Sequence, residues 1–399
     1  QAYAFLLQQA FAGGGRGNSY LDRPNKTASL HHIWVAGPST INELLITASL
    51  DRVRFQPQEG AGCYQRTCYG ITFPYIFPER KRIFDRIPMV GLAGFQSYNG
   101  PSTSSSSGPI YLLSNNTTKV TGAHTWKWGV SFERSGQNDF DQPSVALENG
   151  RFEFQDVRAG GTTGLAIGNT ALGLFNNYDE IGNRAYTPYR GHMFEAFVQN
   201  SWKATSNLRV EAGLRYTIAQ PYYYSLWRNM AVFDPRRYDP SRAATVSRAG
   251  FVTGGDRFNG VVIPGTGFPD SARGRVAIAD TGEFDRLFSG GGKAWGELQK
   301  LNFQPRLGIA YRLHPKTVIR AGAGRFLARP AVSDSVALGA NPPFQPNASI
   351  VNGLADNPTS GQLQASPFLF MTTDPVFKIP AAYNWSVTVE RLLGLDTTV

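Results

Sequence analysis

The stretch Phe194–Thr217, FEAFVQNSWKATSNLRVEAGLRYT, alternates apolar and polar residues in two runs that a short polar turn separates. In the second run one face is apolar and consists of Leu208, Val210, Ala212, Leu214 and Tyr216. The other face consists of Arg209, Glu211, Gly213, Arg215 and Thr217. Successive side chains of a β-strand point to opposite faces, so this period of two predicts a strand. The first run alternates less cleanly, because Asn200 interrupts an apolar face that ends at Trp202. The stretch therefore predicts a hairpin with one apolar and one charged face.

The composition favours an all-β protein with many turns and few charges. Charged residues make up 17% of the 399 residues, aromatic residues 13%, and there are 43 glycines. The net charge of +10 raises the possibility of a polyanionic partner. The sequence has no compact basic cluster, aromatic RNA-binding motif or zinc-ligand spacing, so we expect no nucleic-acid partner. No apolar run approaches the roughly 20 residues of a membrane helix, whereas a barrel strand needs only about 10 alternating residues.

The same alternation recurs along the chain, and tight turns join the strands in pairs. Further strands are predicted at residues 27–35, 41–55, 110–120, 124–134, 302–313, 317–328 and 383–393. The tight turns are at residues 36–40, 121–123, 204–207 and 314–316. The remaining connections are long, at residues 56–109, 135–191, 218–301 and 329–380.

Short turns on one side and long loops on the other are typical of outer-membrane barrels, whereas soluble sandwiches have modest loops at both ends. The sequence therefore predicts an all-β fold, an antiparallel transmembrane β-barrel segment with short periplasmic turns and long extracellular loops. Within the long connections, RFEF is a candidate short strand. TTGLAIGNTALGLF is a candidate short helix or buried loop, and the serine tract Ser102–Ser107 is assigned to a loop.

Aromatic residues gather near both ends of the predicted strands. Those near the short turns are Trp34, Trp126, Trp202 and Tyr311, and those near the long loops are Tyr216, Tyr383 and Trp385. Two aromatic levels about one strand length apart are expected at the two interfaces of a membrane. The alternative is the ordinary preference of aromatic residues for strands.

The two cysteines, Cys63 and Cys68, lie close together in CYQRTC. A metal site would need more ligands, so we expect a disulfide that closes a small loop, which implies an oxidising compartment. Two free thiols are the alternative.

At the hairpins the sequence resembles the Oar-like branch of the TonB-dependent outer-membrane receptors. The matching stretches are INELLITASLDR, GAHTWKWGVSFER, FVQNSWKATSNLRVEAGLRY, MAVFDP, NFQPRLGIAYRL, KTVIRAGAGRF, NPPF and YNWSVTVERLL. The resemblance implies a roughly 22-stranded barrel with an N-terminal plug, energised across the periplasm by the TonB system. About nine strands are predicted here, with no plug-like segment, TonB box or aromatic last residue. We therefore expect residues 1–399 to be a partial outer-membrane barrel domain whose plug and N-terminal domains are absent.

Two groups of candidate site residues follow from the pattern. Residues expected to project into the lumen are Arg209, Glu211, Arg215, Gln304, Arg306, Arg312, Arg320 and Glu390. They either contact a plug or ligand, or simply solvate the lumen and pair with one another. Loop aromatics expected to capture ligand at the surface are Tyr222, Tyr223, Tyr224 and Trp227. The alternative is that these aromatics pack the loop onto itself.

No G-x-S-x-G, H-E-x-x-H or Walker A motif is present, so we expect no enzyme activity, catalytic residue, metal site or cofactor. The first functional hypothesis is a fragment of an outer-membrane receptor that imports or exports a large glycan, peptide or protein ligand. Its partners would be outer-membrane lipid and the TonB system, acting through a plug outside this chain. The second is a surface adhesion or assembly protein without active transport, and the third is a secreted β-protein that binds carbohydrate.

Overall fold

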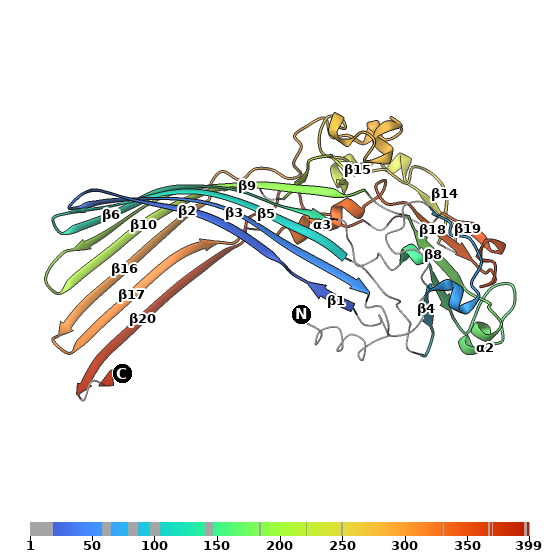
Figure 1. The fold of residues 1–399 in the computed structure, drawn as a ribbon, viewed down its shortest axis with the longest axis horizontal. Helices are drawn as coiled ribbons and strands as arrows, with labels where there is room; N and C mark the ends of the chain where they lie inside the picture. Colours follow the sequence, from blue (N-terminus) through green and yellow to red (C-terminus); the bar gives the residue numbers. More distant parts are fainter. Residues whose placement is uncertain are drawn as a thin grey trace.

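The computed structural model is a long, curved antiparallel sheet that carries a cap of loops at one end (Figure 1). The structure describes residues 19–57, 65–78, 87–95, 104–139, 147–182, 185–220, 222–248, 250–329, 331–365, 368, 370–394 and 397–398. We call the long strands of the sheet the wall, and the described residues within 65–95, 147–186, 222–301 and 331–379 the loop assembly. The tight turns lie at the end of the wall that is remote from the loop assembly (Figure 1).

Within the described residues, the main sheet has 12 strands in the order β1-β3-β5-β6-β9-β10-β16-β17-β20-β21, with β2 also paired to β3 and β11 to β9. The wall consists of β2 (Asn25–Gly37), β3 (Thr40–Pro57), β5 (Ser104–Thr121), β6 (His124–Asp139), β9 (Thr187–Lys203), β10 (Leu208–Ala219), β16 (Phe303–His314), β17 (Thr317–Leu327) and β20 (Ala381–Gly394). Short strands complete the sheet: β1 (Ser19–Asp22), β11 (Tyr224–Ser225) and β21 (Thr397–Thr398). Each strand predicted from the sequence is present, and so are the four tight hairpins.

The pairing register puts apolar residues opposite apolar residues from strand to strand. Leu214 of β10 is opposite Val198 of β9, and Val210 is opposite both Trp202 of β9 and Ile309 of β16. Residues directly opposite in a ladder point to the same face, so the wall has one continuous apolar face. The side chains of this face remain open: Leu214 is 43% exposed, and Trp385 of β20 is 80% exposed.

The buried apolar cores lie in the loop assembly instead. Among the described residues, three clusters of buried hydrophobic side chains form, centred on residues such as Ile263, Met230 and Phe175, which are 0–1% exposed. Every member of these clusters except Tyr189, at the loop end of β9, lies outside the wall strands. An apolar sheet face without a protein core against it is the arrangement expected where lipid supplies the apolar contact.

Several wall strands continue farther toward the loops than the apolar alternation indicates. The assignment of Ser102–Ser107 to a loop was wrong for its described part, because β5 begins at Ser104 and pairs Ser104 with Phe55 of β3. Likewise β9 begins at Thr187, paired with Asp139 of β6. The strand pairing continues through these segments although their side chains do not alternate in polarity, and at the loop end of β9 Thr187 and Tyr189 are buried against the loop assembly.

The loop assembly contains a second sheet and two short ladders. The second sheet has the order β19-β18-β8-β7-β4 and consists of β4 (Met89–Leu92), β7 (Arg151–Phe154), β8 (Asn177–Ile181), β18 (Asn347–Val351) and β19 (Gln362–Gln364). The short ladders pair β12 (Val232–Phe233) with β15 (Val261–Val262), and β13 (Thr245–Val246) with β14 (Val252–Gly254). The predicted strand RFEF is β7.

Helices in the described residues are short and lie between these strands. The α-helices are α2 (Ala166–Ala171), inside the predicted TTGLAIGNTALGLF segment, and α3 (Ser333–Val336). The 3₁₀ helices are Arg66–Tyr69, Pro235–Arg237, Pro240–Arg242, Asp270–Ala272, Ala277–Asp280, Asp285–Leu287, Ala337–Ala340 and Pro358–Ser360. No helix among the residues described is long and apolar enough to cross a membrane.

Candidate functional site

The residues predicted to face the lumen share the polar face of the wall. Arg215 of β10 is opposite Gln304 of β16, and Arg209 is opposite Ala310, which in turn is opposite Arg320 of β17. The remaining members are on the same face: Glu211, Arg306, Arg312 and Glu390. The wall therefore brings the set together on one surface, and which of its members contact a ligand or plug stays a prediction.

A hydrogen-bond network near the loop end of this face links four adjacent strands. Glu195 of β9 accepts hydrogen bonds from Arg215 Nη1 and Thr217 Oγ1 of β10, both at 2.8 Å. Gln304 of β16 donates to Thr217 Oγ1 at 2.9 Å and accepts from the backbone N–H of Leu327 of β17 at 3.1 Å. Glu195 carries the charge-assisted bonds of this network, which are the stronger kind.

Two other polar contacts lie on the same face at different depths. Arg320 and Glu390 form a two-pronged ion pair at 3.0 and 3.3 Å, with side chains 54% and 40% exposed. Such an exposed pair contributes little to stability. The guanidinium of Arg306 lies over the ring of Phe326, 4.7 Å from its centroid.

A third group, which the sequence analysis did not select, joins the wall to the loop assembly. Arg329, which follows β17, donates to Glu133 of β6 at 2.7 Å and to Ser135 Oγ at 3.2 Å. Its guanidinium lies 4.8 Å from the ring centroid of Tyr223, whose hydroxyl is 3.1 Å from Ser135 Oγ. The alternation of β6 already put Glu133 on the polar face, but nothing in the sequence pairs it with a residue 196 positions away.

Aromatic residues lie on the apolar face at both levels where the sequence predicted them. Near the tight turns, the ring of His124 stacks on Trp202 at 5.6 Å and on Trp126 at 6.3 Å. The other residues predicted for this level are Trp34, 59% exposed, and Tyr311, 43% exposed. At the loop level Tyr216 packs on Phe303 with ring centroids 5.0 Å apart. Tyr383 and Trp385 are the other predicted members, 73% and 80% exposed. Their contact with membrane interfaces stays a prediction.

The loop tyrosines predicted to capture ligand lie in the interior of the loop assembly. Tyr222, Tyr223 and Tyr224 are 3%, 7% and 2% exposed, and Trp227 is partly buried against the cluster around Ile263. Tyr222 donates a hydrogen bond to the carbonyl of Asp374 at 3.1 Å. This placement agrees with the alternative that these aromatics pack the loop onto itself. The interior is favoured because burying each aromatic ring removes a large apolar area from water.

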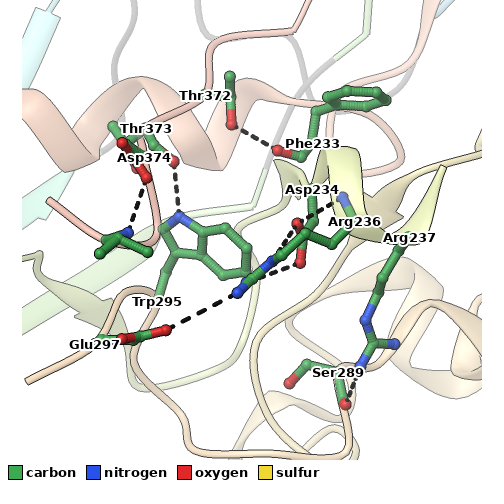
Figure 2. A network of polar contacts seen from close by, with 11 residues as sticks. Phe233, Asp234, Arg236, Arg237, Ser289, Trp295, Glu297, Thr372, Thr373 and Asp374 are labelled. Carbon is green, nitrogen blue, oxygen red and sulfur yellow. Dashed lines mark hydrogen bonds and ion pairs between the residues drawn. The ribbon is translucent and has the colours of Figure 1, made fainter.

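A polar network holds the MAVFDP segment, residues 230–235, to the loop that precedes β20 (Figure 2). Figure 2 shows Arg236 folded onto Asp234, with Nε and Nη2 donating to the carboxylate at 3.0 and 3.1 Å. These bonds hold the pKa of Asp234 below its ordinary value, against the opposing effect of burial. Trp295 Nε1 donates to the Thr373 carbonyl at 3.0 Å, and Thr372 Oγ1 to the Phe233 carbonyl at 2.9 Å.

Two adjoining cavities lie next to the second sheet of the loop assembly. One, of about 580 Å³, includes Phe344 and Arg275 in its lining, and the other, of about 780 Å³, includes Arg257. Ile76 and Phe77 line both. The backbone of these two residues is fixed by a buried carboxylate on β8, described next.

Glu180 is the buried group that positions the segment between the two cavities. Its carboxylate accepts hydrogen bonds from the backbone N–H groups of Ile76 and Phe77 at 3.0 and 2.8 Å, and from Tyr178 Oη at 2.8 Å. Burial, together with this carboxylate, raises the pKa of the Tyr178 hydroxyl. Mixed apolar and polar linings of this size are typical of ligand pockets.

The predicted disulfide cannot be followed in the structure, because Cys63 lies outside the described residues. Cys68 is within the 3₁₀ helix Arg66–Tyr69. The pairing stays a prediction.

Comparison with solved structures gives membrane receptors and transporters of low sequence identity. The ferric-catecholate import receptor Fiu of E. coli K12, in its closed form, is 13% identical with a TM-score of 0.37, and the match covers 96% of this chain and 46% of Fiu. The copper transporter OprC is 10% identical with a TM-score of 0.33, covering 86% of this chain and 45% of OprC. The siderophore receptor PiuA of Acinetobacter baumannii is 11% identical with a TM-score of 0.22, covering 94% and 44%. The chain thus spans less than half the length of these proteins.

No curated protein sequence matches the chain. The family described as outer membrane beta barrel domain matches residues 3–399, nearly the whole chain. This match confirms the predicted fold class and the bacterial outer-membrane location. The chain belongs to the outer membrane β-barrel domain family.

Proposed function

We propose that the chain forms part of the wall and the ligand-binding loops of an outer-membrane receptor that moves a large ligand through a plugged barrel. The TonB system would supply the energy through a plug outside this chain. The observation that carries the proposal is the two-faced wall. One face is apolar and open, and the other links Glu195, Arg215, Thr217 and Gln304 in a polar network suited to a water-filled or plugged interior.

The open edges of the sheet support a larger barrel. In the pairing pattern of the described residues, β2 is paired only with β3, and β20 is paired with β17 and, at its end, with the short strand β21. One edge of β2 and most of one edge of β20 are therefore unpaired. Unpaired backbone N–H and C=O groups are too costly in hydrocarbon, which is why membrane sheets close into barrels. Further strands, from the same protein or another copy, are therefore required to complete the wall. Because the chain spans under half the length of the matched receptors, this favours a partial barrel domain.

The loop assembly supplies the ligand contacts in this proposal. Its two cavities share Ile76 and Phe77, and their linings combine apolar rings with Arg257, Arg275 and amide side chains. Ring faces with nearby guanidinium groups suit the ring faces and hydroxyls of a glycan, or the side chains of a peptide. The ferric-catecholate, copper and siderophore ligands named above belong to those other proteins and do not define this one.

The test uses the full-length parent protein purified from outer membranes in detergent. Surface plasmon resonance against the purified periplasmic domain of TonB is expected to show saturable binding. Glycan and peptide arrays are expected to give ligand binding that Glu180→Gln weakens, since this variant loosens the Ile76–Phe77 segment. Arg248→Gln, an exposed change elsewhere in the loops, is the matched control. A parent protein that is soluble without detergent would contradict the barrel, and one that binds no TonB would contradict energised transport.

A further inference from the structure

A group of basic side chains lies on the lipid-facing side of the wall, just beyond the apolar belt at the loop end. Arg134 of β6 is two residues beyond Phe132 on the same face and lies opposite His192 of β9 and Tyr111 of β5. Arg190 of β9 is opposite Tyr224 of β11. Lys293, from the loop assembly, places its ammonium 4.4 Å from the ring centroid of Tyr224. We call Arg134, Arg190 and Lys293 the outer basic patch.

The patch has no acidic counterpart in the part of the chain that the structure describes. None of its three cations has a carboxylate within 4.0 Å there, and Arg134 and Lys293 are exposed. Arg190 donates to Asn138 Oδ1 at 2.8 Å and to the Tyr189 carbonyl at 2.6 Å, both neutral acceptors. Positive charge this concentrated calls for an anionic partner.

Next to the patch is a cleft on the same face. Its volume is about 450 Å³, and its lining includes Phe132, Phe194, Ile218 and Leu298 together with His192. The His192 ring stacks on Phe132 at 5.9 Å, and its Nε2 is 3.0 Å from Tyr224 Oη. Its Nδ1 atom is buried without a hydrogen-bond partner. The cleft is therefore mainly apolar and lies beside the outer basic patch.

We propose that the outer basic patch and this cleft bind a phosphorylated, acylated lipid of the outer leaflet. Its phosphate would lie between Arg134, Arg190 and Lys293, which are suited to charge-assisted hydrogen bonds with phosphate oxygens. An acyl chain would run over Phe132 and Phe194, which line the cleft. Basic residues directly above an apolar belt are the arrangement that binds anionic lipid at a membrane surface.

The inference rests on the proposed orientation, in which the long loops face the outside, but it requires no transport. Native mass spectrometry of the full-length parent protein in neutral detergent can test it. The probes are bis-phosphorylated lipid A and its dephosphorylated form with the same acyl chains. The altered protein is Arg134→Gln/Lys293→Gln, and the matched control is Arg248→Gln/Lys300→Gln, which removes two exposed cations of the loop assembly.

Wild-type and control proteins are expected to retain the phosphorylated lipid, and the patch variant to retain it at least about tenfold less tightly. The dephosphorylated lipid is expected to bind all three proteins weakly. Equal loss in the patch variant and the control would overturn the proposal, because it would show a general charge effect. Equal retention of the two lipids by the wild type would also overturn it. Folding of each variant is checked by its heat-modifiable migration on a gel.

Discussion

Replacing Glu195 by alanine should weaken the wall more than the same replacement of Glu211, an exposed glutamate on the same face. Glu195 accepts two hydrogen bonds at 2.8 Å, from Arg215 and Thr217, and its side chain is 19% exposed. Hydrogen bonds to charged groups contribute about 1.5–3 kcal/mol each. Because Arg215 is 33% exposed, water replaces part of that loss, and we expect the free energy of unfolding to fall by about 2–3 kcal/mol.

Two variants calibrate this value. Glu195→Gln keeps the shape and one acceptor, so the expected loss is about 1 kcal/mol. Glu211→Ala is the matched control, since Glu211 is exposed and its side chain accepts a single hydrogen bond, from Ser201 at 3.3 Å. Its expected effect is within about 0.5 kcal/mol.

The assay is guanidinium unfolding of the full-length protein in phospholipid vesicles, followed by tryptophan fluorescence. The predicted order of unfolding midpoints is wild type and Glu211→Ala together, then Glu195→Gln, then Glu195→Ala. Equal midpoints for Glu195→Ala and Glu211→Ala would refute the reasoning, because they would mean that the network across β9, β10, β16 and β17 does not stabilise the wall.

Three further outcomes are expected. Val198→Arg, four residues from the Trp202 level on the lipid face, should destabilise the barrel in vesicles by about 2–4 kcal/mol, whereas Gln199→Arg on the opposite face should cost less than about 1 kcal/mol. Phe175→Ala, at a side chain that is 0% exposed, should destabilise the loop assembly by about 3–5 kcal/mol in hydrogen exchange and leave the wall unchanged. Because the pKa of Asp234 is lowered in the folded protein, its stabilising effect is present above the ordinary carboxyl pKa of about 4. This stabilising effect should disappear as the pH falls through the lowered pKa of Asp234 in the folded state. Limited proteolysis at decreasing pH is expected to show that loss of stability in the wild type and not in Asp234→Asn.

The wall was predictable because its side chains repeat with a period of two next to short turns. In β10 the apolar set from Leu208 to Tyr216 and the polar set from Arg209 to Thr217 both keep their faces in the structure. The register follows from the tight turns, since a one-residue slip would move every apolar side chain to the polar face. Family membership and the outer-membrane location agree with that pattern.

The loop assembly was not predictable in the same way, because its contacts join residues far apart in the chain. Glu180 binds the backbone of Ile76 and Phe77 across more than 100 residues, and Arg329 reaches Glu133 across 196. Neither pair has a local signature. The same limit explains Tyr222–Tyr224, whose run of aromatic residues is equally compatible with a surface patch and with the interior in which the structure places it.

The strand ends beyond the apolar belt are an intermediate case. Ser104 and its neighbours pair with β3, but residues 104–107 are all serine, so their sequence carries no alternation of polarity to recognise. The outer basic patch arises from the same extension. Arg190 precedes the predicted start of its strand, and only the observed register aligns it with Tyr224 on the lipid-facing side.

The most direct test of the two-faced wall is spin-label scanning of residues 208–217 of the full-length protein in phospholipid vesicles, with Cys63 and Cys68 replaced by serine. Each labelled site is measured for collision with oxygen, which concentrates in lipid, and with a water-soluble nickel complex. We expect oxygen collision to peak at the even-numbered sites, from Leu208 to Tyr216, and to be low at the odd-numbered sites, from Arg209 to Thr217. A profile without a period of two, or with the opposite phase, would contradict the assignment of the apolar face to lipid and of the charged face to the barrel interior.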